Sequence, residues 1–106
     1  MAIDTRPPKA EFARRLARGG YEDFLVLERG TAERVLTEKR LELLDTLRAE
    51  RVESISELAS RVDRDVSAVH RDLDLLFEHG LVEYETEGSR KAPHLKHEHV
   101  FVEPVL

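Results

Sequence analysis

The spacing of the apolar residues changes along the chain, and each spacing predicts a different kind of element. Over residues 9–18 the apolar positions recur every three or four residues, which predicts a helix that ends at a glycine pair. The short apolar run over residues 24–28, FLVLE, predicts a strand, and residues 29–30 predict a turn after it. Residues 1–8, which end in two prolines, are expected to form an extended arm.

A second helix is expected to begin after Thr37, whose hydroxyl can accept a hydrogen bond from the first helical turn. Leu41, Leu44 and Leu47 are predicted to form its buried row, supported by Leu43 and Val52. This helix would brace the two helices that follow it in the sequence.

Residues 54–82 predict two short helices separated by a tight turn. Ser54 and Glu57 stand in the S-x-x-E relation of a capping box at the start of the first helix. Asp65 is a suitable N-cap for the second helix, and Gly80 is a suitable left-handed C-cap for it. The apolar residues of each helix fall on one face, so the two helices can share a core.

After the second of these helices the period changes to that of a strand. Residues 82–87 alternate between glutamates and less polar residues, which predicts a half-buried strand. Residues 88–93, GSRKAP, predict a turn-rich tip, and residues 97–103 are expected to form the strand that returns from it. The sequence therefore predicts a two-stranded hairpin with Arg90 and Lys91 at its tip.

Two helices joined by three or four residues are the signature of a helix-turn-helix, whose second helix can enter the DNA major groove. Residues 55–62, ISELASRV, resemble the second helix of winged helix-turn-helix regulators. Residues 68–82, AVHRDLDLLFEHGLV, resemble their recognition helix and the Gly-Leu-Val that leads into the wing. The resemblance is to MarR- and ArsR-like transcription regulators, most closely to short archaeal DNA-binding regulators, and covers roughly residues 36–103. That family usually has serine or threonine in place of His70, so no base preference carries over there.

The pattern and the resemblance together imply an α+β fold. We expect a winged helix-turn-helix domain over residues 36–106, with a three-helix core and a two-stranded wing. Residues 1–35 are expected to add an arm, a helix and a short strand. One compact domain is expected, because 106 residues suit a single core.

Composition narrows the possible functions. The chain has no cysteine, which excludes disulfides, thiol catalysis and cysteine-based zinc sites. It has no glycine-rich phosphate loop, no metal-ligand set and no nucleophile beside an evident base, so neither an enzyme nor a cofactor is predicted. The apolar runs are too short to cross a membrane, and residues 1–10 lack the apolar core of a signal peptide. A cytoplasmic protein that does not bind a membrane is expected.

The first two turns of a recognition helix reach furthest into a groove, so they hold the candidates for base contact: Ser67, Ala68, His70 and Arg71. Arg71 is foremost, because arginine can donate two hydrogen bonds to guanine, and the alternative is an ion pair within its own helix. The candidates for phosphate contact lie at the start of the preceding helix, around the turn and at the wing tip: Ser56, Arg61, Arg64, Arg90 and Lys91.

The charge balance opposes DNA binding. The formal net charge is −5, and the predicted recognition helix carries Asp65, Asp72, Asp74 and Glu78 against Arg71. Since a local cationic patch matters more than the total charge, DNA binding stays the leading hypothesis, with weak non-specific affinity. The alternative is a winged-helix module that binds another protein, because a fold alone does not fix function.

Double-stranded DNA is the expected partner, bound by a homodimer, since such domains read half-sites about one helical turn apart. The dimer contact is expected from the helix over residues 9–18 or from the segment over residues 101–106. Residues 1–20 hold five basic and two acidic residues. This excess favours either a basic arm that touches phosphates or a partner subunit, or simply a solvated helix.

Three histidines, His94, His97 and His99, lie close together in the sequence, and such a spacing can chelate a metal ion. Because the chain has no cysteine and no evident fourth ligand, exposed histidines on a hairpin are the simpler interpretation. No metal site is predicted.

Overall fold

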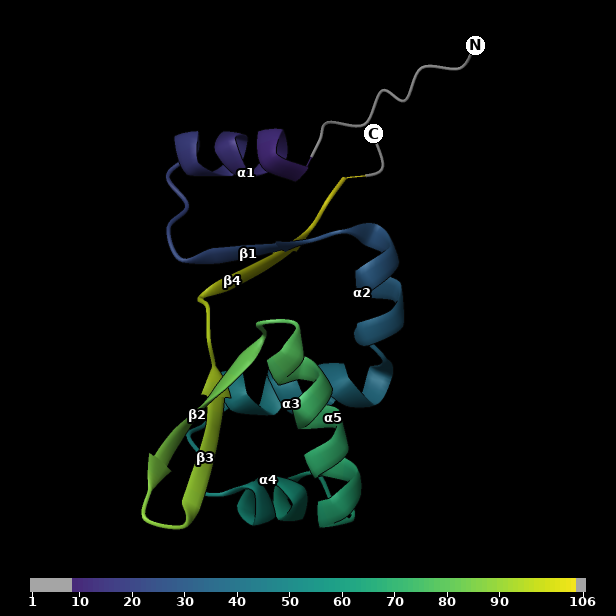
Figure 1. The fold of residues 1–106 in the computed structure, drawn as a ribbon, viewed down its shortest axis with the longest axis vertical. Helices are drawn as coiled ribbons and strands as arrows, with labels where there is room; N and C mark the ends of the chain where they lie inside the picture. The colour runs from purple at the N-terminus through teal and green to yellow at the C-terminus, as the bar shows by residue number, and fades with distance from the viewer. Residues whose placement is uncertain (1–8, 105–106) are drawn as a thin grey trace. The chain divides into compact units, whose positions relative to one another are not determined.

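A computed structural model of the chain describes residues 9–104, so the arm predicted for residues 1–8 lies outside the described residues. The elements follow one another in the order α1-β1-α2-α3-α4-α5-β2-β3-β4 (Figure 1). Instead of one compact domain they form two units, one of residues 35–96 and one of residues 9–34 with 97–104. None of the described helices is long and apolar enough to cross a membrane.

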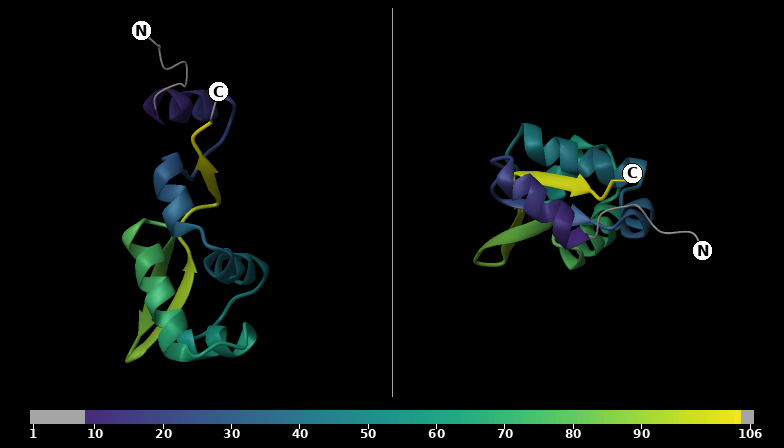
Figure 2. Two further views of the ribbon diagram at one scale, coloured as in Figure 1. Left: turned by 90° about the vertical axis from the view of Figure 1, so that its right-hand side faces the viewer. Right: turned by 90° about the horizontal axis from the view of Figure 1, so that it is seen from above.

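The unit of residues 35–96 contains three helices and a hairpin. The helices are α3 (Glu38–Ala49), α4 (Ile55–Arg61) and α5 (Val66–Glu78), and the strands are β2 (Val82–Glu87) and β3 (Arg90–Leu95). The three helices contact one another, and each of them contacts a strand of the hairpin (Figure 2). This is the three-helix core with a two-stranded wing that the sequence predicted.

Helices α3 and α4 begin where the sequence predicted, because polar side chains satisfy their first backbone N–H groups. Thr37 Oγ1 accepts a hydrogen bond from the Arg40 N–H at 3.3 Å. Ser54 Oγ accepts one from the Glu57 N–H at 3.0 Å, and the Glu57 carboxylate accepts one from the Glu53 N–H at 2.7 Å. The second bond of the capping box therefore reaches one residue further back than the standard pattern.

The turn between α4 and α5 contains a residue in the left-handed region. Asp63 has φ +53°, a conformation that aspartate tolerates better than most residues. The Arg64 N–H donates to the Ala59 carbonyl at 3.0 Å and closes the end of α4. Asp65 then stands at the N-cap of α5, but its carboxylate accepts from the Ser67 hydroxyl at 2.5 Å rather than from the helix backbone.

The core of this unit is aliphatic, and most of its fully buried side chains come from α3, α4, α5, the segment between α3 and α4, and the start of the wing: Leu43, Val52, Leu58, Val69, Leu73, Leu76, Leu81 and Val82. The row predicted for α3 was wrong, because Leu43 is its buried residue, Leu44 and Leu47 are half-buried, and Leu41 is 41% exposed. The four leucines of α3 spread over nearly half of the helix circumference, so their spacing alone could not show which of them points into the core.

The return strand of the wing was predicted wrongly. It is β3, and the residues 97–103 assigned to it lie outside the hairpin. The turn is tighter than expected, with Gly88 at φ +62°, and Pro93 is buried within the strand rather than placed at the tip. A proline is tolerated there because β3 has a single neighbouring strand and does not need a second row of N–H donors.

The other unit is built on two parallel strands. It contains α1 (Lys9–Arg18), β1 (Phe24–Leu27), α2 (Arg29–Val35) and β4 (His99–Val102). Strand β1 pairs with β4, with Phe24 opposite His99 and Leu27 opposite Val102 (Figure 1). Residues 97–104, which were expected within the winged domain, therefore belong with the N-terminal elements.

The prediction of a turn at residues 29–30 was also wrong, because these residues begin α2. The Ala32 N–H donates to the Glu28 carbonyl at 2.9 Å, which is the first bond of this helix. The glycine at position 30 is compatible with a helix, although it favours one less than alanine does.

The two leucines of α3 with opposite exposure give a test of this packing. Leu43→Ala should lower the free energy of unfolding by about 2–5 kcal/mol, because it leaves a cavity in the core. Leu41→Ala, on the same helix but 41% exposed, should lower it by less than about 1 kcal/mol. Urea unfolding followed by circular dichroism measures both, and equal losses would show that α3 packs through a different side.

Candidate nucleic-acid interface

The first two turns of α5 present the four residues predicted for base contact. Ser67, His70 and Arg71 are exposed, and Ala68 is half-buried. On the opposite side of the same helix Val69, Leu73 and Leu76 are completely buried. The buried side fixes the rotation of α5 about its axis, so its polar side keeps a defined direction.

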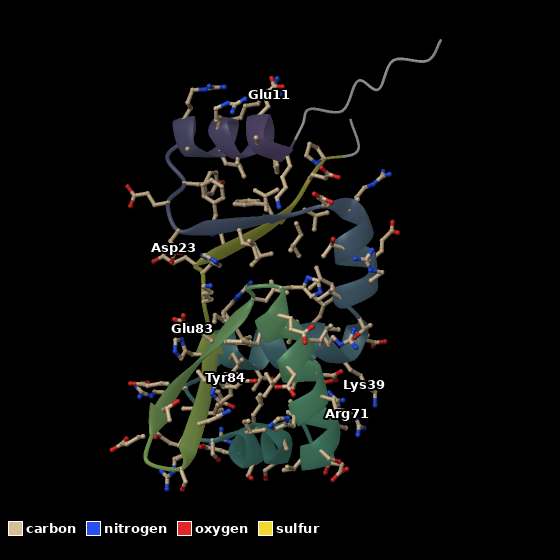
Figure 3. The ribbon with its side chains drawn as sticks, viewed as in Figure 1. Glu11, Asp23, Lys39, Arg71, Glu83 and Tyr84 are labelled. Atoms are coloured by element: carbon tan, nitrogen blue, oxygen red, sulfur yellow. The ribbon has the colours of Figure 1, made fainter. Side chains whose placement is uncertain are left out.

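Arg71 is the free cation of this helix. Its side chain is exposed and projects away from the core (Figure 3), and it has no hydrogen bond or ion pair with any residue of the described part of the chain. The intrahelical pair that was its alternative role does not form, because Asp74 pairs instead with His70, whose Nδ1 lies 3.2 Å from Asp74 Oδ2. Arg71 is therefore available to an outside partner.

A second free cation, Lys39, lies on α3, which contacts α5. Lys39 precedes Arg40 on α3 and Arg71 precedes Asp72 on α5, and the Arg40 Nε lies 3.0 Å from Asp72 Oδ1, so the two helices touch at this point. Figure 3 shows the labelled Lys39 and Arg71 side chains projecting on the same side. Lys39 is exposed and has no partner among residues 9–104. Lys39 was not among the predicted contact residues, because its helix was expected only to brace the other two.

The contact behind these two cations is a carboxylate held by two arginines. Asp72 Oδ1 accepts from Arg40 Nε at 3.0 Å, and Asp72 Oδ2 accepts from Arg64 Nη2 at 2.7 Å. The three side chains are only 14–21% exposed. One carboxylate on α5 thus connects α3 with the turn that precedes α5, and we call this cluster of Asp72, Arg40 and Arg64 the Asp72 clamp.

The charge of the clamp is set by competing effects on Asp72. Burial by itself would raise the pKa of this carboxyl group, because it disfavours the ionised form. The hydrogen bonds and positive charges of Arg64 and Arg40 outweigh burial and hold the pKa below its ordinary value. Asp72 is therefore ionised at neutral pH, and its charge is compensated locally.

Arg64 has a different position from the one that the sequence implied. It was predicted to contact phosphate. Its side chain is only 14% exposed, however, and its guanidinium pairs with Asp72. Its Nη1 atom is buried without a hydrogen-bond partner among the described residues. Its position suits it to hold the helices together rather than to meet DNA.

The two candidates on α4 are exposed but differ in their surroundings. Ser56 lies in the first turn of α4 and is exposed. Arg61, at the end of α4, pairs with Glu50 at 2.6 Å and with Glu57 at 3.1 Å. Both acids compete with any phosphate for the Arg61 guanidinium.

The wing carries Arg90 and Lys91 at the start of β3, both exposed. Arg90 makes no ion pair within the described residues. Lys91 Nζ lies 5.6 Å from the centre of the Tyr84 ring, and that ring lies 5.5 Å from the ring of Phe77 on α5. These contacts attach the wing to α5, so the cations of the wing and of α5 belong to one packed assembly.

Tyr84 is partly enclosed by these contacts. Its hydroxyl is buried and has no hydrogen-bond partner among residues 9–104. Burial raises the pKa of Tyr84, and the negative charge of Asp74 raises it further. The phenol is therefore neutral and contributes no charge to the interface.

The three histidines singled out in the sequence have separate surroundings. His94 Nδ1 lies 3.7 Å from Glu83, His97 Nδ1 lies 2.8 Å from Asp23, and His99 packs on the Phe101 ring. Within the described residues no group of three or more His, Cys, Asp or Glu side chains is placed to hold a metal ion.

Comparison with known proteins gives one family and several similar structures. The sequence profile of the HVO_A0114 family matches residues 35–102. No curated protein matches the chain. The solution structure of the homodimeric winged helix-turn-helix DNA-binding domain of Mb0332 from Mycobacterium bovis, a possible ArsR-family transcriptional regulator, is 22% identical, with a TM-score of 0.58 over 92% of this chain and 78% of that one.

Two further structures are similar to the chain. The transcriptional regulator HlyU from Vibrio vulnificus is 21% identical, with a TM-score of 0.58 over 84% of this chain and 82% of that one. An ArsR-like transcriptional regulator from Rhodococcus sp. RHA1 is 28% identical, with a TM-score of 0.55 over 62% of each chain. The winged helix-turn-helix fold predicted from the sequence is confirmed by these similarities.

The Asp72 clamp should make the stability of the protein sensitive to acid. The pKa of Asp72 is lowered in the folded state. The contribution of the ionised carboxylate to the free energy of unfolding is therefore complete above the unfolded-state pKa of about 3.9, and it is lost as the pH falls through the folded-state pKa. Asp72→Asn should therefore lower the free energy of unfolding by about 1–3 kcal/mol at pH 7 and by much less at pH 3. Urea unfolding at the two pH values measures this difference.

Asp74→Asn is the matched control, since Asp74 is 56% exposed and pairs only with the half-exposed His70. Its effect on the free energy of unfolding should be small at both pH values. If Asp72→Asn were as mild as Asp74→Asn at pH 7, the clamp would contribute nothing to holding the helices.

Proposed function

The chain belongs to the HVO_A0114 family, and from its winged helix-turn-helix fold we propose that it is a cytoplasmic, sequence-specific DNA-binding transcriptional regulator with no enzymatic activity of its own. In this proposal α5 enters the major groove and the wing lies on the phosphate backbone. The observation that carries it is the free, exposed Arg71 on the polar side of a helix whose other side is completely buried.

The proposed base contacts come from the first two turns of α5: Ser67, Ala68, His70 and Arg71. Arg71 supplies the strongest contact, because its guanidinium can donate two hydrogen bonds to one guanine. His70 is shared with Asp74, so its ring nitrogens are only partly available to a base. The proposed phosphate contacts lie around this helix: Lys39, Ser56, Arg61, Arg90 and Lys91.

We add Lys39 to the phosphate contacts predicted from the sequence and leave Arg64 out. An ammonium group beside the recognition helix can meet a phosphate that flanks the groove without reading the bases. Arg64 is left out, since its guanidinium would have to leave Asp72, and an unpaired Asp72 carboxylate would then be buried.

The acidic residues of α5 repel DNA less strongly than the composition of the helix implies. Of its acids, Asp72 is compensated by two arginines, and Asp74 lies beside His70. Because the charge of Asp72 is balanced at short range, its field at a phosphate further away is weak. Few cations remain free, however, so we expect modest non-specific affinity.

We also propose that two copies act together. Domains of this kind read half-sites about one helical turn apart, and a single recognition helix gives limited specificity. The similar domain of Mb0332 from Mycobacterium bovis is described as homodimeric, which supports the same assembly here.

The competing function is a module that binds another protein through the same fold. It is favoured by the outer face of α3, where Glu38, Glu42 and Asp45 have no ion pair among the described residues and Leu41 is 41% exposed. Such a face repels DNA and suits a basic protein surface. A chain that binds no duplex in the selection below would favour this second function.

Selection of bound duplexes from a random DNA pool should yield an enriched site that contains a guanine contacted by Arg71. Arg71→Ala should weaken binding to that site by about 5- to 150-fold, the equivalent of about 1–3 kcal/mol, and should relax selection at the guanine. Fluorescence anisotropy with the selected duplex measures the affinity.

Arg48→Ala is the matched control. Arg48 is also exposed and has no ion pair among the described residues, but it lies in the last turn of α3 and not on α5. It should change neither the affinity nor the selected sequence. If Arg71→Ala selected the same site with the same affinity as the unmodified chain, α5 would not be the reading helix.

Lys39→Ala should weaken binding by a similar factor to matched and unrelated duplexes, because a phosphate contact carries no sequence information. The slope of log affinity against log salt concentration should fall by about one unit, since one phosphate fewer is neutralised. Anisotropy titrations at several salt concentrations measure the slope, and an unchanged slope would remove Lys39 from the interface.

A further inference from the structure

The sheet of the unit formed by residues 9–34 and 97–104 is open at both edges. It consists of β1 and β4 alone, so within the described residues each strand has one edge with no neighbour. One face of the sheet is covered by aromatic rings: the Phe101 ring lies 6.4 Å from Phe12 of α1 and 5.1 Å from Tyr21. That face is therefore closed by residues of the same unit.

The opposite face is aliphatic and partly bare. By the register of the strands it is formed by Leu25, Leu27, Val100 and Val102. Val100 is 38% exposed and Val102 is 39% exposed, whereas Leu27 on β1 is buried. On this face the side chains of β4 are thus more accessible than those of β1.

The two sheets of the molecule differ in how their edges are protected. Strand β2 of the wing has a glutamate at every second position, and β3 has Arg90, Lys91 and Pro93. Charges and prolines of this kind keep exposed strands from pairing with other chains. Strands β1, FLVL, and β4, HVFV, contain no Asp, Glu, Lys, Arg or Pro. The strands of the wing are therefore suited to remain exposed to solvent, whereas β4 is suited to pair with a strand of another chain.

The small size of the unit leads to the same conclusion. Its described part, residues 9–34 and 97–104, has 34 residues, a size at which a single core rarely suffices without disulfides, metals or oligomerisation. The chain has no cysteine, and no metal-binding group occurs among residues 9–104. Parallel strands also occur almost only in sheets that are covered on both faces. Of the usual means of stabilising so small a unit, oligomerisation is the one that fits these residues.

We propose that β4 pairs antiparallel with β4 of a second copy across a two-fold axis, which extends the sheet to the order β1-β4-β4-β1. A register centred on Phe101 places Val100 opposite Val102 and His99 opposite Glu103. This pairing joins the bare aliphatic faces of both copies and opposes no like charges, whereas β2 paired with itself would bring glutamates together. This pairing rests on the proposed function in one respect: the dimer is expected to place two copies on two half-sites.

The absence of cysteine allows a direct test of this register. Val100→Cys and Val102→Cys change exposed positions, so each variant should fold. Under mild oxidation, a mixture of the two variants should form a disulfide-linked dimer at least about ten times faster than either variant alone, because the two positions lie opposite each other. Glu87→Cys, on the exposed wing, is the control and should give no such dimer. Absence of linkage in the mixture would overturn the proposed pairing.

The assembly is tested separately by sedimentation. The unmodified chain should be a dimer at tens of micromolar, and Val102→Lys should weaken the dimer by at least about tenfold, because it places two ammonium groups at the shared edge. Thr86→Lys on the wing should leave the dimer intact. A monomeric unmodified chain, or a dimer that Val102→Lys does not weaken, would overturn the proposal.

Failure of this inference can be told apart from failure of DNA binding. Val102→Lys should leave the affinity for a duplex with one half-site unchanged and should lower the affinity for a duplex with two. Arg71→Ala should lower the affinity for both duplexes and leave the sedimentation of the dimer unchanged.

Discussion

The unit of residues 35–96 depends on a single carboxylate, that of Asp72. It is the one group that joins α3, the turn and α5 by polar contacts, at 3.0 Å to Arg40 and 2.7 Å to Arg64. The apolar core could tolerate small sliding of α5, because hydrophobic contacts have no preferred direction. A carboxylate held by two planar guanidinium groups does not tolerate it, since the geometry of both bonds would be lost. The position of Arg71, the next residue along the helix, is fixed as a result.

This arrangement has an electrostatic consequence. Arg40 and Arg64 pair with Asp72, so they add little to a cationic surface. The same pairing compensates the negative charge of Asp72, which would otherwise repel an anionic partner. The cations that remain exposed include Lys39 on α3, Arg71 on α5, and Arg90 and Lys91 on the wing. Under the proposed function, a small set of cations gives modest attraction to any duplex, so discrimination between sequences would come from base contacts and from the use of two half-sites. A net charge of −5 is compatible with that proposal, because it weakens binding to DNA in general.

The parts of the structure that were predictable from the sequence are those that depend on neighbouring residues. The N-caps Thr37 and Ser54 and the alternation in β2 can each be recognised from four to six consecutive residues. The errors concern distant partners. Strand β4 was assigned to the wing because pairing of residues about 75 apart leaves no local signal, and the contact of Arg40 with Asp72, 32 residues away, leaves none either. The charge pattern did contain a usable signal, since β4 lacks the charges that both wing strands carry.

The order of the elements along the chain makes one unit depend on the other. Residues 35–96 are continuous and contain mostly local contacts, whereas β1 and β4 come from the two ends and can pair only when the whole chain between them is accommodated. The entropy lost in closing so long a loop must be recovered by a short parallel pair of strands. Folding of residues 35–96 shortens the effective loop and lowers that loss, so this unit should form first and the β1–β4 sheet should follow. Any change that loosens the Asp72 clamp therefore also weakens the sheet, although no residue of the sheet belongs to the clamp.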